Sequence, residues 1–246
     1  MVGPVSAALE RQSGETLVAA DAAELATLGA ELLARAIDDA VRTRGRARVA
    51  LSGGTTPGPM LKELAGLALP WDRVEWFQVD ERAVPPDHER SNFRGIVQAL
   101  GEVGRAGTLF RMEAERGDRA AAAAAYGAQL RRSFGVARAV ELDAMVLGVG
   151  DDGHTASLFP GTEAVAIEDR LVAAVDAPDG LEPRLTLTAP IIREARLALV
   201  LVRGAGKREA VRAARAGGDL DAVPARVIGA CTGRVVWLLD PEAAGT

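Results

Sequence analysis

The sequence has one cysteine and two histidines among its 246 residues, and this scarcity excludes several kinds of site. The single cysteine, Cys231, can form neither an intramolecular disulfide bond nor a cysteine-rich zinc site. Small residues surround Cys231 ahead of an apolar run, which is typical of a buried thiol rather than a nucleophile. With so few imidazole and thiol groups, we expect no metal centre.

Long hydrophobic runs and an excess of positive charge are also absent. No segment reaches the roughly 20 uninterrupted apolar residues of a membrane span. The first 15 residues lack the basic region and apolar run of a secretory signal. The formal net charge of −5 argues against nucleic acid as the main partner, because duplex-binding proteins present a basic face. We therefore expect a cytoplasmic protein without membrane or nucleic-acid partners, although a local basic pocket for a small anion remains possible.

The chain alternates between short apolar runs and amphipathic stretches, and 48% of its residues are hydrophobic. Strands are expected at 15–20, 47–52, 73–79, 142–150, 184–189, 196–202 and 234–240, and helices at 21–45, 59–68, 91–100, 118–134 and 207–216. Buried strands alternating with helices predict an α/β fold with a largely parallel sheet covered by helices on both faces. We expect a single domain over residues 1–246, acting as a monomer.

Loops rich in glycine and in polar or charged residues follow four of the expected strands, at residues 52–56, 80–82, 150–154 and 203–207. Ligands of α/β sheets bind at the carboxyl ends of the strands. We therefore expect these four loops to meet at one site.

The loop of residues 52–58 joins an expected strand to an expected helix. Gly53 and Gly54 allow the backbone to approach a ligand. Backbone N–H groups with the hydroxyls of Ser52, Thr55 and Thr56 can hold a phosphate. An ordinary tight turn explains the same residues, and both interpretations stay open at this point. No G-K-[ST] follows, so a phosphate monoester fits better than a nucleoside triphosphate.

The triplet Asp80, Glu81 and Arg82 is expected at a strand end. Such a triplet is usually a solvated loop, but its place beside the other loops favours a functional interpretation. Arg82 offers a planar fork of donors that suits a phosphate, a carboxylate or a developing oxyanion. His88 follows within a charged, proline-containing loop and is a poor candidate for a catalytic base.

Gly148, Gly150 and Gly153 have the G-x-G-x-x-G spacing of a dinucleotide-binding loop. That loop needs a helix directly after its glycines, whereas here the segment ends at Pro160 within a few residues. The intervening acidic residues would also repel a pyrophosphate. We therefore expect no dinucleotide cofactor.

His154 remains as the candidate proton-transfer group of this loop. A histidine suits proton transfer near neutral pH, and Asp152 can orient its ring. The alternative is a histidine that only bonds its own loop. Lys207, at the start of an expected helix, can reach an anion attracted by the helix N-terminus, and Arg184 can join it; a plain surface lysine is the alternative for Lys207.

Five segments together resemble the 6-phosphogluconolactonase family. They are LSGGTTP (51–57), FQVDERAVPPDHERSNFR (77–94), LGVGDDGHTASLFPG (147–161), PRLTLTAPIIREAR (183–196) and GAGKREAV (204–211). The resemblance covers residues 49–240, and the second and third segments are the most specific. It implies a Rossmann-like α/β fold and no metal or organic cofactor. The implied reaction hydrolyses 6-phospho-D-glucono-1,5-lactone to 6-phosphogluconate in the pentose phosphate pathway, with this phosphorylated sugar lactone as the small-molecule partner.

The resemblance also implies a division of labour among the candidates. His154 would activate a water and later protonate the leaving ring oxygen, Asp152 would support His154, and Arg82 would stabilise the oxyanion. Substrate and phosphate binding would fall to Ser52, Gly53, Gly54, Thr55, Asp80, Arg184 and Lys207. Arg82 and Arg184 can each serve either the phosphate or the oxyanion.

Two other functions stay in view. Related glucosamine-6-phosphate deaminases follow D-G-H with an IAFNEP-like stretch whose glutamate completes a ring-opening triad. Here TASLFPG follows, with no acid until Glu163. A non-catalytic sugar-phosphate sensor would use the same phosphate-binding loops, but sensors usually carry a DNA-binding module, for which the chain has no room.

Overall fold

The computed structural model describes residues 14–135, 140–178 and 180–246. The prediction about a secretory signal concerns mainly residues 1–13, which lie outside the described residues. Within the described ranges, every helix is too short or too polar to cross a bilayer.

Seven parallel strands form the main sheet, as the alternation of apolar runs predicted. Their spatial order is β1 (Glu15–Val18), β10 (Arg234–Leu239), β9 (Leu197–Val202), β6 (Ala144–Leu147), β2 (Ala47–Leu51), β3 (Val74–Gln78) and β5 (Thr108–Leu109). The chain adds β3 and β5 on one side of β2, then returns to build β6, β9 and β10 on the other. The order of strands therefore reverses between β2 and β6, where open α/β sheets form their ligand crevice.

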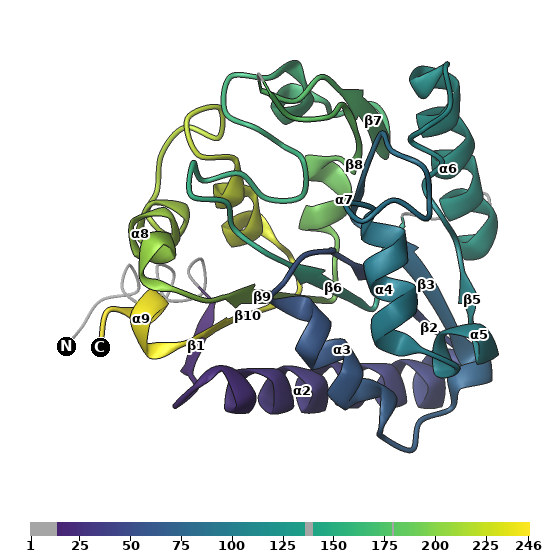
Figure 1. Ribbon diagram of the computed structural model, residues 1–246, viewed down its shortest axis with the longest axis vertical. Helices are drawn as coiled ribbons and strands as arrows, with labels where there is room; N and C mark the ends of the chain where they lie inside the picture. Colours follow the sequence, from purple (N-terminus) through teal and green to yellow (C-terminus); the bar gives the residue numbers. More distant parts are fainter. Residues whose placement is uncertain (1–13, 136–139, 179) are drawn as a thin grey trace.

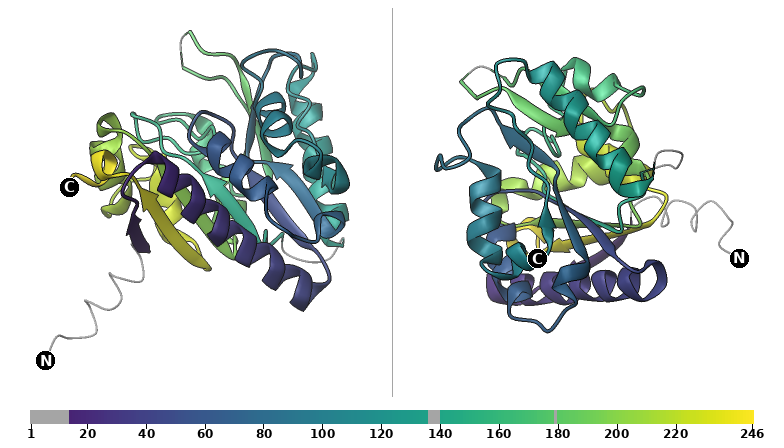
Figure 2. Two further views of the ribbon diagram at one scale, coloured as in Figure 1. Left: turned by 60° about the horizontal axis from the view of Figure 1, so that its bottom comes forward. Right: turned by 90° about the vertical axis from the view of Figure 1, so that its right-hand side faces the viewer.

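Helices cover both faces of this sheet, which confirms the predicted α/β architecture (Figures 1 and 2). The helices among the described residues are α2 (Ala22–Arg44), α3 (Pro57–Ala65), α4 (Asn92–Leu100), α5 (Val103–Ala106), α6 (Arg119–Phe134), α7 (Ala189–Arg193), α8 (Arg208–Arg215) and α9 (Pro241–Ala244). Apolar residues of α2, α3 and α4 pack on one face, and those of α6, α7 and α8 pack on the other.

Strand β9 shows why the sequence pattern is continuous rather than alternating. All six of its residues are buried. Leu197, Leu199 and Leu201 enter one core, whereas Ala198, Val200 and Val202 enter the other. A strand covered on both faces needs apolar side chains at every position.

The predicted helix starts are also confirmed. The Asp21 side chain accepts hydrogen bonds from the backbone N–H groups of Ala23 and Glu24, at 2.8 and 2.9 Å. The Glu24 carboxylate accepts from the backbone N–H of Ala20, the residue before the cap, instead of from Asp21 as in a standard capping box. The Ser91 hydroxyl caps α4 in the same way, through the backbone N–H of Arg94.

A second, antiparallel sheet is the main difference from the expected architecture. It consists of β4 (Asp80–Arg82), β8 (Arg184–Leu187) and β7 (Val172–Val175). Residues 80–82 therefore form a short strand rather than a loop, and the expected strand at 184–189 pairs outside the main sheet. In residues 184–189 (RLTLTA) apolar side chains alternate with polar ones, as is usual in antiparallel sheets. This pattern is the signal in the sequence for a pairing outside the main sheet.

Candidate active site

All four predicted segments contribute residues to one cleft of about 290 Å³ at the carboxyl edge of the main sheet. Three of them are loops, and the fourth, residues 80–82, is the short strand β4. The walls of the cleft come from residues that follow β2, β3, β6 and β9. These are Ser52, Gly53, Gly54, Thr55, Thr56, Asp80, Arg82, Asn92, Gly148, Gly150, His154, Ala156, Arg203 and Lys207, with a few apolar neighbours. Of the predicted site residues, only Asp152 and Arg184 are not part of this lining.

The loop after β2 is closely packed against the start of α4. A Cβ atom on Gly53 would lie 2.2 Å from Oδ1 of Asn92, so no larger residue fits without displacing that side chain. Gly54 has a φ of +107°, a conformation that L side chains rarely adopt. Both glycines are therefore required by the shape of the loop that leads into α3.

Asp80 and Glu81, the acidic residues that follow β3, make different contacts. Asp80 lies at the cleft, where its carboxylate accepts hydrogen bonds from Ser157 Oγ at 2.6 Å and Asn92 Nδ2 at 3.1 Å. Glu81 is only 2% exposed and lies at the N-terminus of α4. Its carboxylate accepts from the backbone N–H groups of Asn92 and Phe93, both at 2.8 Å. Glu81 thus fixes α4, and with it Asn92, against the cleft.

The loop after β6 holds His154 through its ring. Nδ1 of His154 lies 2.6 Å from Oδ1 of Asp152, and the ring packs against Phe159 at a centroid distance of 4.8 Å. With Nδ1 donating to the carboxylate, Nε2 is the nitrogen left to accept a proton in the neutral ring. A Cβ atom on Gly150 would lie 2.1 Å from Nδ1 and 2.6 Å from the Asp152 carboxylate.

The glycine pattern of this loop is therefore explained by packing around a histidine. Gly150 leaves room for the Asp152–His154 pair, and Gly153 has a φ of +83°. Partial burial by itself would raise the pKa of Asp152, but hydrogen bonds and attraction from His154 outweigh it and lower that pKa. Asp152 is accordingly a carboxylate at neutral pH, which favours a proton on the facing Nδ1.

The following turn connects this loop to the second sheet. The backbone N–H of Ser157 donates to Thr186 Oγ1 of β8 at 3.0 Å, and Ser157 Oγ bonds Asp80. Ala156, at the cleft, has a φ of +53°, an uncommon value for a residue with a Cβ. This left-handed turn, held at both ends, ties the loop after β6 to the one after β3.

Three cations reach the cleft, although the chain as a whole has a formal net charge of −5. Arg82 donates from Nη1 to the backbone oxygen of Arg90 at 2.7 Å. Lys207 Nζ lies 2.8 Å from Oδ1 of Asp151. Arg203 is exposed at the rim. The lining contains these three cationic side chains and one carboxylate, that of Asp80. The cleft therefore suits an anion.

Arg184 lies behind this surface. In the antiparallel pairing of β4 and β8, the backbone of Arg184 lies opposite that of Arg82, and Arg184 is 6% exposed. Burial lowers the pKa of its guanidinium, against the attraction of Asp80. Its Nε has no hydrogen-bond partner among the described residues. Arg184 therefore is not part of the cleft lining, and its Nη2 lies 4.0 Å from a carboxylate oxygen of Glu182.

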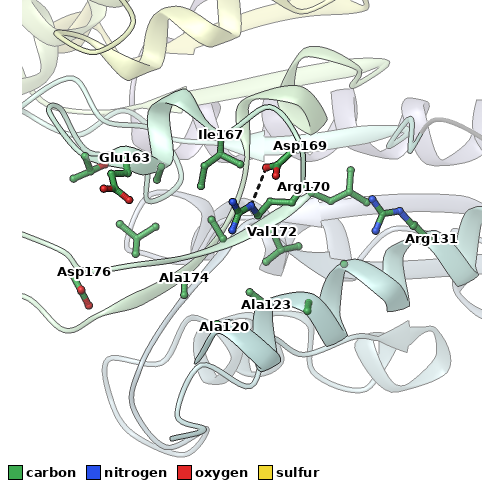
Figure 3. Close-up of a pocket in the computed structure, with 17 residues that line it drawn as sticks. Ala120, Ala123, Arg131, Glu163, Ile167, Asp169, Arg170, Val172, Ala174 and Asp176 are labelled. Carbon is green, nitrogen blue, oxygen red and sulfur yellow. Dashed lines mark hydrogen bonds and ion pairs between the residues drawn. The ribbon is translucent and has the colours of Figure 1, made fainter. Parts of the chain in front are cut away.

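A larger groove, of about 570 Å³, lies between α6 and β7 (Figure 3). Alanines of α6 line one wall, and Glu163, Asp169, Arg170 and Asp176 surround the opposite one. None of the predicted site residues lines it. Glu163, the first acid after the His154 loop, belongs to this groove and not to the cleft.

Metal-ligating side chains do not gather in the described ranges: no group of three or more histidine, cysteine, aspartate or glutamate residues is placed to hold an ion. Cys231 is half-buried and donates from Sγ to the backbone oxygen of Ala195. Burial raises the pKa of its thiol, which opposes a nucleophilic role.

The sequence matches one protein family over most of its length. Residues 20–237 fit the family of glucosamine-6-phosphate isomerases and 6-phosphogluconolactonase. The chain belongs to this family.

Individual members support the match. The chain is 39% identical to the 6-phosphogluconolactonase of Nostoc sp., over 87% of this chain and 90% of that protein. It is 41% identical to the enzyme of the same name from Synechocystis sp., over 84% and 87%. The solved structure of 6-phosphogluconolactonase from Trypanosoma brucei superposes with a TM-score of 0.85 at 28% identity, covering 94% of this chain and 98% of that one. The family's α/β fold is the one described above.

Sequence reasoning missed several residues of the cleft. Asn92 directly follows the helix cap Ser91 and carries no signal of its own in the sequence. In the structure its side chain donates to the Asp80 carboxylate and packs against Gly53. Ser157 was missed because its partner Asp80 lies 77 residues away. Arg203 was within a loop assigned to the site, but only Lys207 of that loop was singled out.

The hydrogen bonds of Glu81 generate a prediction about stability. Replacing the buried carboxylate in Glu81→Gln places an amide against N–H donors, so the free energy of unfolding should fall by about 3 kcal/mol. Urea denaturation measures this change. The control is Glu89→Gln, an exposed glutamate of the next loop, which should change stability by less than about 0.5 kcal/mol. Equal stability of wild type and Glu81→Gln would contradict the structural role.

Proposed function

We propose that the chain hydrolyses 6-phospho-D-glucono-1,5-lactone to 6-phosphogluconate, the ring-opening step of the pentose phosphate pathway. The observation that carries the proposal is the Asp152–His154 pair at a cleft with an excess of cations. The names of the Nostoc and Synechocystis relatives support the same reaction. A δ-lactone is an activated ester, so a general base and an oxyanion donor are enough for its hydrolysis.

His154 acts as the general base in this mechanism. Nε2 accepts a proton from a water while that water attacks C1 of the lactone, which forms a C1–O bond and a tetrahedral oxyanion. The oxyanion then collapses, the bond between C1 and the ring oxygen breaks, and the proton on Nε2 passes to the leaving ring oxygen. Asp152 keeps the proton on Nδ1 and stabilises the imidazolium between the two steps.

The other polar groups of the cleft divide between the two ends of the substrate. Arg82 stabilises the oxyanion, and Asp80 accepts hydrogen bonds from sugar hydroxyls. The loop from Ser52 to Thr55, with Gly53 and Gly54 at its turn, binds the phosphate through its N–H and hydroxyl groups at the start of α3. Lys207 adds a charge from the opposite wall. Arg184 is the second arginine at this end through the pairing of β8 with β4, although its side chain is buried outside the cleft lining.

A deaminase is the second candidate within the family. Ring opening by the deaminases requires a glutamate that follows the D-G-H segment. The first such acid here, Glu163, lines the groove between α6 and β7 (Figure 3) rather than the cleft. This placement favours the lactonase. A non-catalytic sensor differs from both by binding the sugar phosphate without turnover, which a lactone hydrolysis assay separates directly.

The setting of the reaction rests on the sequence. We propose that the chain acts as a monomer in the cytoplasm, on a small molecule, without nucleic acid, metal or organic cofactor.

The catalytic role of His154 is tested by His154→Asn. Loss of the general base should lower kcat by about 10²-fold or more, while KM changes little. Turnover is measured by acid release from freshly prepared lactone, with spontaneous hydrolysis subtracted. The chain's other histidine supplies the control, because His88→Asn should keep wild-type kcat. Wild-type kcat in His154→Asn would rule out the proposed base.

Metal independence is tested by prolonged treatment with EDTA. Because the proposed steps need only side chains, lactone hydrolysis should be unchanged after chelation and dialysis. Loss of activity that zinc or magnesium restored would overturn the proposed mechanism.

Phosphate recognition is tested by Lys207→Met, which keeps the apolar stem and deletes the charge. A charge-assisted hydrogen bond contributes roughly 1.5–3 kcal/mol, so KM for the phosphorylated lactone should rise by about 10- to 150-fold. Turnover at saturation should fall much less.

Two controls separate this effect from others. Unphosphorylated gluconolactone cannot use Lys207, so its kcat/KM should be nearly unchanged. The chain's other lysine, Lys62, is exposed on α3 outside the cleft, and Lys62→Met should behave as wild type. Equal losses on both lactones would mean that Lys207 acts at the carbonyl or supports the fold.

A further inference from the structure

Arg203 lines the cleft, but the proposed mechanism assigns it no role. It follows β9 directly, lines the cleft, and has no hydrogen bond or ion pair with another described residue. Its backbone is nevertheless well anchored. The N–H of Gly204 lies 3.0 Å from both carboxylate oxygens of Asp240, and the Asp240 N–H donates to the Val202 oxygen at 3.2 Å. A fixed backbone thus holds an unpartnered guanidinium at the rim.

The charge balance at this end of the cleft requires such a group. Lys207 is paired with Asp151 at 2.8 Å, so the two together carry no net charge. A phosphate monoester carries about −1.5 to −2 at pH 7. Arg82, the remaining cation, shares the lining with the carboxylate of Asp80 and donates to the backbone oxygen of Arg90. A phosphate beside Lys207 would therefore meet too little positive charge.

We infer that Arg203 is a second phosphate-binding cation, supplying the charge that Asp151 withdraws from Lys207. The inference rests on the proposed function and assigns a specificity-determining residue to the same site. Arg203 and Lys207 lie four positions apart, on the turn that leads into α8. A guanidinium offers a planar fork of donors that fits two oxygens of one phosphate. Arg203 therefore selects phosphorylated over unphosphorylated lactones.

The first test is Arg203→Gln, which keeps a polar side chain and removes the charge. KM for the phosphorylated lactone and the inhibition constant of inorganic phosphate should each rise by about 10-fold. The values of kcat and of kcat/KM on unphosphorylated gluconolactone should stay within twofold of wild type. The matched control is Arg212→Gln on α8, an exposed arginine outside the cleft with the same change in net charge.

The second test uses charge rescue. In the double variant Arg203→Gln/Asp151→Asn, Lys207 is released from its counter-ion, so most of the lost affinity for the phosphorylated lactone should return. A merely structural role of Arg203 would show no such rescue. An unchanged KM in Arg203→Gln, or a double variant as weak as the single one, overturns the inference.

Failure of the proposed function is distinguishable from failure of this inference. If the wild type does not hydrolyse the phosphorylated lactone, the proposed function is wrong. Calorimetry with inorganic phosphate then tests Arg203 without turnover, and the inference predicts an affinity about 10-fold lower for Arg203→Gln than for wild type and Arg212→Gln. Equal affinities overturn it.

Discussion

Parallel pairing of four consecutive strands is the constraint on which the cleft depends. β9, β6, β2 and β3 are neighbours in the sheet and run in the same direction, so their carboxyl ends form one edge. The reversal of strand order between β2 and β6 opens that edge and leaves room for a ligand. Loops whose first residues are 28 (52 to 80) to 151 (52 to 203) positions apart in the chain thereby present their polar groups to one volume of about 290 Å³.

Within that frame, close packing determines which residues the loops can contain. Gly150 admits the ring of His154 and the carboxylate of Asp152, and Gly53 admits the side chain of Asn92. The second sheet holds the same loops from outside, through Thr186 and the hydrogen bond from Ser157 to Asp80. Side chains that are locked in this way hold the Asp152–His154 pair in a fixed geometry, which under the proposed function would lower the entropic cost of the reaction.

Electrostatics then distinguishes the two ends of the cleft. At one end the Asp152 carboxylate orients the imidazole of His154. At the other, N–H groups at helix starts and cationic side chains suit a phosphate. The ion pair between Lys207 and Asp151 links the ends, because Asp151 directly precedes the carboxylate that orients His154. A protein with a net negative charge can in this way retain a local site for an anionic substrate.

The sequence by itself determined the features that depend on local pattern. Continuous apolar runs specified buried parallel strands, and Asp21 and Ser91 marked helix starts. Because β-strands followed by helices place their loops at a common edge, even the convergence of Ser52, Asp80, His154 and Lys207 followed from the order of elements. The Pro160–Gly161 stop after His154 excluded a dinucleotide loop, and the turns found there agree.

Only the tertiary structure decided matters that depend on partners distant in the chain. Glu81 and Asp80 are adjacent and chemically alike, yet one is buried under α4 and the other faces the cleft, because a strand points successive side chains to opposite sides. Arg184 was expected in the cleft, but β8 pairs with β4, and the Arg184 side chain is buried outside the cleft lining. The pairing of Lys207 with Asp151, and the lack of any partner for Arg203 among the described residues, likewise depend on distances that no local pattern encodes.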